Sequence, residues 1–139
     1  MQTPQRIVIV DRSAIFRNTL ARYLVLLDAN YEVVGEAASD EAALLEIARV
    51  HPAIVLLDLD LPDRSGLATT EDIRLHWSDI TIIAVTNYLD REYCDAARRA
   101  GACDCLDKLA LVEQLPAVLA AISADRPARL TDAICLENA

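Results

Sequence analysis

Short apolar runs alternate with amphipathic segments along the 139 residues of the chain. The runs are rich in β-branched residues and lack polar alternation, which is typical of strands covered on both faces in a parallel sheet. They lie at 7–10, 31–35, 53–57, 80–85 and 103–106. The segments between them repeat apolar residues at helical spacing. The order βαβαβαβαβα therefore predicts an α/β domain with a five-stranded, doubly wound parallel sheet and helices on both faces.

Local signals support the expected helices. The helix expected over 40–50 has Ser39 as its N-cap, two acidic residues in its first turn and Pro52 just beyond its end. Gly101 follows the amphipathic segment 90–100, where glycine commonly ends a helix. We expect the domain to cover residues 5–124. Residues 125–139 have little periodicity and are expected to form a C-terminal tail.

Composition and charge exclude several classes of function. Hydrophobic residues make up 54% of the sequence and charged residues 25%, which is enough to bury a core. The net charge of −9 disfavours contact with a phosphate backbone, so we expect no direct nucleic-acid binding. No run of 18 apolar residues is present, so we expect no membrane span. The first six residues do not resemble a signal peptide, and we expect a cytoplasmic location.

The cysteines are expected to be free thiols. They are Cys94, Cys103, Cys105 and Cys135, and they form no C-x-x-C pair. The two histidines are not spaced to complete a zinc site with them. Free thiols are the usual state in a reducing compartment. Cys103 and Cys105 would share one face of a strand and pack as small hydrophobic side chains, which gives only weak grounds for a redox role.

Polar side chains follow four of the five predicted strands. Asp11 follows the first strand, Asp58 closes the third with Asp60 two residues on, Thr86 closes the fourth, and Lys108 follows the fifth. Ligands of open α/β sheets bind at the carboxyl ends of the strands, so we expect these residues to lie at one edge of the sheet. Lys108 is the one lysine beside 12 arginines, and a guanidinium does not replace a compact ammonium.

With these residues in place, the sequence resembles the receiver domain of bacterial two-component response regulators over residues 5–124. Together with the alternation of strands and helices, the resemblance implies the strand order 2-1-3-4-5. The most specific stretch, residues 54–66, is similar to the family's strand, phosphoacceptor aspartate, Leu-Pro pair and helix-opening glycine. Further similarities lie in Ile9-Val10-Asp11 with Phe16-Arg17, in Val85-Thr86, and in the Gly-Ala and lysine segment over 100–108.

The resemblance implies phosphorelay signal transduction rather than an enzyme with turnover. Asp58 would attack a phosphoryl group carried on a sensor histidine kinase, a phosphotransfer protein or a small donor. Asp11, Asp58 and Asp60 would hold Mg²⁺ between the mutually repelling oxygens. Lys108 and Thr86 would contact the phosphoryl oxygens. Movement of Thr86 would alter the face made by the fourth helix, fifth strand and fifth helix, which a downstream protein partner reads. The sequence leaves a homodimer open.

Three residues depart from the family's pattern. The first strand of a receiver usually ends in two adjacent acids, of which the second binds the metal directly, and Arg12 occupies that second place. We expect Arg12 to weaken the Mg²⁺ site, to pair with Asp58 or Asp60 and to depress the pKa of Asp58 while it is paired. The alternative is that Arg12 points into solvent and a water molecule takes the ligand position. Asn87 stands where the family mostly has a small residue, and Cys105 where it often has an aromatic switch residue.

Two alternative functions remain beside the phosphorylated receiver. One is a receiver-like binding module that does not depend on phosphate and is held in one state by Arg12, which replaces the metal. The other is a haloacid-dehalogenase-like phosphohydrolase, because Asp58-Leu59-Asp60 also resembles the D-x-D motif of that family. Steady release of phosphate from a monoester would distinguish the phosphohydrolase.

Overall fold

The computed structural model describes residues 3–87 and 91–125, and strands alternate with helices throughout them. The strands are β1 (Gln5–Val10), β2 (Tyr31–Ala37), β3 (Ile54–Asp58), β4 (Thr81–Thr86) and β5 (Asp104–Asp107). The helices are α1 (Ala14–Leu27), α2 (Asp40–Val50), α3 (Gly66–His76), α4 (Arg91–Ala100) and α5 (Leu111–Asp125). A single 3₁₀ turn, η1 (Lys108–Ala110), joins β5 to α5.

The five described strands form one parallel sheet in the order β2-β1-β3-β4-β5, which confirms the predicted topology. The register brings the carboxyl ends of neighbouring strands side by side. Val10 pairs with Leu57 and Asp58 with Val85, while Thr86 pairs with Asp107 at the end of β5. The ends of four strands therefore meet at one edge of the sheet, as the positions of the polar residues predicted.

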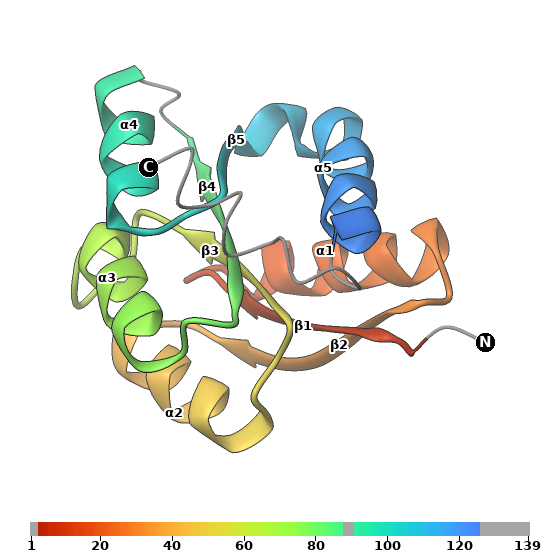
Figure 1. Cartoon of the computed structure of the whole chain (residues 1–139), viewed down its shortest axis with the longest axis horizontal. Helices are drawn as coiled ribbons and strands as arrows, with labels where there is room; N and C mark the ends of the chain where they lie inside the picture. The colour runs from red at the N-terminus through yellow and green to blue at the C-terminus, as the bar shows by residue number, and fades with distance from the viewer. Residues whose placement is uncertain (1–2, 88–90, 126–139) are drawn as a thin grey trace.

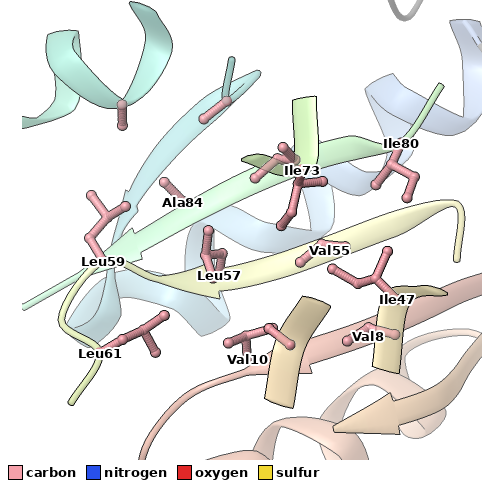
Figure 2. Close-up of a cluster of buried hydrophobic side chains, with 14 of the residues drawn as sticks. Val8, Val10, Ile47, Val55, Leu57, Leu59, Leu61, Ile73, Ile80 and Ala84 are labelled. Carbon is pink, nitrogen blue, oxygen red and sulfur yellow. The ribbon is translucent and has the colours of Figure 1, made fainter. Parts of the chain in front are cut away.

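Two helical layers cover the two faces of the sheet, as Figure 1 shows. Helices α2, α3 and α4 pack on one face, and α1 and α5 on the other. Alternate strand residues serve the two layers: Val8 and Val10 point to the first, Ile7 and Ile9 to the second. The central strands β1, β3 and β4 read as unbroken apolar runs because both of their faces are covered. Figure 2 shows the first layer, where Ile47 of α2 lies over the strand residues Val8 and Val55.

Serine side chains cap three of the helices. Ser13, Ser39 and Ser65 each accept a hydrogen bond from a backbone N–H in the first turn of α1, α2 and α3. Ser39 was predicted as a cap, and the structure confirms it. Gly101 has a φ of 126°, so it ends α4 in a conformation that favours glycine. The predicted start of this helix at Asp90 and the tail residues 126–139 lie outside the described residues.

The structure corrects the prediction of free thiols. Cys94 of α4 and Cys105 of β5 form a disulfide with Cα atoms 5.5 Å apart, and no cysteine among the described residues is free. Sequence spacing gave no signal, because the pairing depends on α4 packing against β5. Separately, no helix in the described part of the chain is long and apolar enough to cross a membrane.

Candidate functional site

Four polar side chains gather at the carboxyl edge of the sheet. Asp11 follows β1, Asp58 and Thr86 are the last residues of β3 and β4, and Lys108 follows β5 in η1. The two carboxylate residues and the threonine are almost fully buried, with 0%, 3% and 1% of their surfaces exposed. Buried charged groups are unfavourable unless they are paired, so this cluster needs a cation.

Lys108 supplies that cation. Its Nζ lies 2.6 Å from Oδ2 of Asp11 and 3.4 Å from Oδ2 of Asp58. The ammonium also lies 4.2 Å from the centroid of the Phe16 ring, a distance at which a cation is attracted to the aromatic face. Phe16 of α1 is thus part of the site, whereas in the sequence it served only to align the first helix. One lysine therefore connects β1, β3, β5 and α1.

Hydrogen bonds hold Asp11 through both its carboxylate and its backbone carbonyl. Its Oδ1 accepts a hydrogen bond from the N–H of Ser13 at 2.8 Å. Nη1 of Arg17 donates to the carbonyl oxygen of Asp11 at 2.7 Å. The second carboxylate oxygen, Oδ2, accepts no hydrogen bond and has the ammonium of Lys108 as its partner. A metal ion bound at that oxygen would share it with the ammonium of Lys108.

The loop after β3 holds Asp58 from the other side. The N–H of Asp60 donates to Oδ1 of Asp58 at 3.0 Å, and the N–H of Leu59 donates to the carbonyl of Val85 at 2.9 Å. Gly66 begins α3 directly against this turn. A Cβ on Gly66 would lie 2.7 Å from the carbonyl oxygen of Asp58 and would collide with the Cα of Leu59. The absence of a side chain lets α3 approach the loop closely.

The pKa of Asp58 is raised above its ordinary value. Burial is the largest cause, because it penalises the charged carboxylate, and the nearby Asp11 adds repulsion. The hydrogen bond from Asp60 and the charge of Lys108 act in the opposite direction but do not outweigh them. The prediction of a depressed pKa is therefore wrong. The prediction considered the charge of Arg12 and left out the burial of Asp58 at the end of its strand, which the sequence does not show directly.

Arg12 does not make the contacts predicted for it. Its side chain is exposed, and no hydrogen bond or ion pair joins it to Asp58 or Asp60 within the described residues. The carboxylate of Asp11 points into the protein, and the side chain of the next residue points to solvent. Lys108 occupies the position between the carboxylates that the sequence prediction assigned to Arg12.

The predicted three-carboxylate metal site is only partly formed. Asp60 is exposed and contributes its backbone N–H to Asp58, and the described residues contain no group of three acidic, histidine or cysteine side chains placed to hold a metal. Asp11 and Asp58 do converge. Mg²⁺ is commonly bound by one or two carboxylates together with phosphate oxygens and water. The pair, with one carboxylate oxygen that accepts no hydrogen bond, fits such an ion.

Comparison with known proteins identifies the arrangement. The family model of the response regulator receiver domain matches residues 7–120. The chain belongs to this family. Like other receiver domains it is a response-regulator module of phosphorelay signalling, and the phosphohydrolase alternative is not favoured. Receiver domains typically bind Mg²⁺ in the phosphorylation site, which agrees with the paired carboxylates found here.

Individual relatives agree with the family assignment. The receiver is 32% identical over 122 residues to the transcriptional regulatory protein PdtaR of Mycobacterium tuberculosis. This match covers 86% of the present chain and 58% of PdtaR. It is 36% identical over 97 residues to the uncharacterized transcriptional regulatory protein YhcZ of Bacillus subtilis, with 70% and 45% covered. The chain thus spans about half the length of these relatives.

A solved structure shows the same fold. A two-component response regulator of the LuxR family from Aurantimonas sp. SI85-9A1 superposes with a TM-score of 0.81 and 30% sequence identity. The match covers 88% of this receiver and 86% of that chain. The strand order and the helical layers described above are therefore those of the family.

Proposed function

We propose that this receiver domain accepts a phosphoryl group on Asp58 from a sensor histidine kinase or a phosphotransfer protein. The observation that carries the proposal is the placement of Asp58: it ends a buried strand, with the ammonium of Lys108 3.4 Å from its Oδ2. A carboxylate fixed by the sheet beside a cation is positioned for attack on a phosphorus atom.

The neighbouring residues take separate roles in this transfer. An oxygen of Asp58 forms the new bond to phosphorus while the bond to the donor breaks and its electron pair leaves with the donor. Lys108 neutralises the charge of the phosphoryl oxygens, and the hydroxyl of Thr86 donates a hydrogen bond to one of them. Asp11 and Asp58 would hold Mg²⁺, which supplies electrostatic stabilisation of the transferred group.

The two other acids near Asp58 are less suited to phosphorylation. Asp63 is engaged with α2: its Oδ1 and Oδ2 accept hydrogen bonds from the N–H groups of Asp40 and Glu41 at 2.8 and 3.2 Å. Asp60 is exposed in the loop, without the fixed orientation that a strand gives. These contacts support Asp58 as the phosphoacceptor.

Arg12 enters the proposal through its charge rather than through a contact. It replaces an acid beside the site and stays exposed, so it lowers the local negative potential without binding Asp58. We propose that this weakens Mg²⁺ binding. The phosphate-independent alternative, in which Arg12 takes the place of the metal, is not favoured, because the arginine does not contact the carboxylates within the described residues.

The remaining parts of the proposal concern the setting of the domain. We propose a cytoplasmic location and a protein partner that reads the face made by α4, β5 and α5 once Asp58 is phosphorylated. The chemistry proposed for the domain itself is limited to acceptance and loss of the phosphoryl group. Direct contact with nucleic acid is not proposed, given the net charge of −9.

The test is intact-mass analysis after incubation with acetyl phosphate and Mg²⁺. We expect the mass to increase by one phosphoryl group in the natural chain and to stay unchanged in Asp58→Asn. Asp60→Asn and Asp63→Asn serve as matched controls and should still gain the group. An adduct that persists in Asp58→Asn, or no adduct in the natural chain, would contradict the proposal.

A further inference from the structure

The disulfide between Cys94 and Cys105 joins α4 to an edge strand of the sheet. Cys94 lies in α4 and Cys105 in β5, and their Cα atoms are 5.5 Å apart, within the usual range for a disulfide. β5 pairs only with β4 in the described sheet, and α4 packs on one face of this edge strand. The bond therefore fixes the position of this helix on the strand.

The same helix is attached to the loop of the phosphorylation site at the neighbouring residue. The hydroxyl of Tyr93 donates a hydrogen bond to the carbonyl of Leu59 at 3.2 Å, and Leu59 directly follows Asp58. On the other side of the bond, Cys105 lies three residues before Lys108, which pairs with Asp58. The disulfide thus joins helix α4, which contacts the loop after Asp58, to strand β5, which precedes Lys108.

The fold accommodates the two sulfur atoms in either redox state. Cys94 and Cys105 are 5% and 6% exposed and belong to the apolar layer that also contains Ala97 and Ala102. Free cysteines pack in such layers as small hydrophobic side chains. Reduction would therefore leave no buried charge or large cavity, and the bond is not needed to hold the sulfur atoms in the core.

We propose that Cys94 and Cys105 form a reversible redox latch that fixes α4 to β5 when oxidised and releases it when reduced. In the cytoplasmic setting proposed above, disulfides are usually transient or redox-sensing rather than permanent supports. The oxidant is a low-molecular-weight disulfide such as oxidised glutathione. The latch concerns the mobility of α4 and does not depend on phosphorylation of Asp58.

The exchange reaction balances in two steps. The thiolate of one cysteine attacks a sulfur of oxidised glutathione, which releases one glutathione thiolate and leaves a mixed disulfide. The second cysteine thiolate then attacks the protein sulfur of that mixed disulfide and releases the second glutathione. Two electrons pass to the glutathione pair, and the two protons lost by the cysteines end on the glutathione thiols. Because both sulfur atoms are buried, the attack requires local opening of α4.

The experiment uses the double variant Cys103→Ser/Cys135→Ser, which keeps only the two cysteines of the latch. The chain is equilibrated in buffers with different ratios of reduced to oxidised glutathione, free thiols are alkylated, and the intact mass is measured. Amide hydrogen exchange of residues 91–100 is compared between the oxidised and reduced forms. Cys94→Ser serves as the control that cannot form the bond. The natural chain is treated in parallel and mapped by peptide analysis, so that a folding defect of the double variant does not decide the result.

We expect a monomeric species that lacks two hydrogen atoms to form with oxidised glutathione and to revert with dithiothreitol. In that species we expect the amides of α4 to exchange at least tenfold more slowly than in the reduced form, while those of α2 are unchanged. The proposal is overturned if both thiols remain alkylated at every ratio, if only glutathione adducts or intermolecular dimers form, or if α4 exchanges equally fast in both states.

Discussion

Asp58 combines burial with an ion-pair partner and a raised pKa. It is nearly buried, and burial raises its pKa even though an ammonium lies within ion-pair distance. A carboxylate with a raised pKa is more basic, and a more basic oxygen is the stronger nucleophile. Lys108 therefore reduces the repulsion from Asp11 without converting Asp58 into an inert, tightly paired anion.

The raised pKa of Asp58 predicts that Asp58→Asn stabilises the domain at neutral pH. Between the unfolded value of 3.8 and the higher folded value, the folded state binds more protons, so stability falls as the pH rises through that interval. Above it the natural chain carries the full cost of the buried charge, which asparagine lacks. We expect a Tm several degrees higher for the variant at neutral pH, with the difference shrinking as the pH falls towards about 4.

Thermal unfolding followed by circular dichroism measures this difference. The matched control is Asp60→Asn, because Asp60 is exposed and lies in the same loop. The interpretation fails if Asp58→Asn lowers Tm at neutral pH or if its advantage grows on acidification.

Removal of the Lys108 ammonium should be strongly destabilising. Lys108→Met leaves Asp11 and Asp58 buried without a cation, and loss of one partner from a buried pair costs about 3–5 kcal/mol. Asp11→Asn removes one of the two charges, so the double variant should lose about 1–3 kcal/mol less than the sum of the single losses. Urea unfolding of the four chains measures this coupling, and strictly additive losses would contradict the ion-pair geometry.

Replacement of Arg12 tests its effect on the metal. Arg12→Asp changes the charge beside Asp11 by two units, and we expect Mg²⁺ affinity to rise about three- to tenfold at low salt. Isothermal titration calorimetry measures the affinity. Arg22→Asp makes the same charge change on the exposed surface of α1 and should leave Mg²⁺ binding nearly unchanged. Equal effects of the two variants would show that only net charge matters.

The strand-end rule predicted which side chains would meet, but not how each would point. Asp11, Asp58 and Lys108 were placed correctly because the sheet determines where a strand ends. Arg12 and Asp60 lie beyond the strands, where local turns and rotamers decide direction, and both turned out to be exposed. The contact of Phe16 with Lys108 depends on how α1 packs, which periodicity alone does not specify.

At the level of elements, the approach of α3 to the end of β3 rests on Gly66. An added methyl group would meet the backbone of Asp58 and Leu59, which cannot move without displacing the loop. We expect Gly66→Ala to cost about 1–3 kcal/mol and to slow phosphorylation of Asp58. Chemical denaturation measures the loss of stability. The rate of Asp58 phosphorylation by acetyl phosphate shows whether the loop after β3 has been displaced.

Gly35 provides the matched control for this prediction. The atoms nearest to a methyl group there belong to the flexible side chain of Glu46, which can rotate away. Gly35→Ala should therefore lose much less stability and leave the phosphorylation rate unchanged. Equal losses for the two variants would show that close packing at Gly66 is not what positions the loop.

The elements themselves were largely predictable, whereas one link between them was not. Apolar runs and caps such as Ser39 located the strands and helices, and Gly101 marked the end of α4. The disulfide between Cys94 and Cys105 joins an amphipathic helix to a short strand, and no spacing rule connects the two positions. It becomes visible only when the helix has been placed on the sheet.

Across the whole molecule, the sheet separates two apolar layers, one on each of its faces. Ile47 belongs to the layer of α2, α3 and α4, and Ile83 to the layer of α1 and α5. Ile47→Val and Ile83→Val should each cost about 0.5–1.5 kcal/mol. Because the two side chains belong to separate clusters on opposite faces of the sheet, the double variant should lose the sum within about 0.5 kcal/mol. Urea unfolding measures all three, and a larger deviation would show that the layers are coupled.

The topology of the whole molecule was predictable because few arrangements satisfy a strict alternation of strands and helices. Right-handed crossovers and unbroken apolar runs require a parallel sheet with both faces covered. The strand order β2-β1-β3-β4-β5 was predicted from the alternation together with the resemblance of the strand-end residues to those of receiver domains. What sequence could not supply was the balance of burial and charge around Asp58, which depends on atoms from every layer.

Because Lys108 is the one lysine in the sequence, its NMR signals report on the site alone. Isotope labelling with ¹⁵N-lysine would give one backbone amide signal, and labelling of the side chain one ammonium signal, both from the residue that contacts Asp11, Asp58 and Phe16. A spectrum of this kind needs no assignment. Metal binding, phosphoryl transfer or movement of the Phe16 ring would each shift the ammonium signal of Lys108. The state of the site could therefore be followed in real time in a crude mixture to which the labelled protein is added.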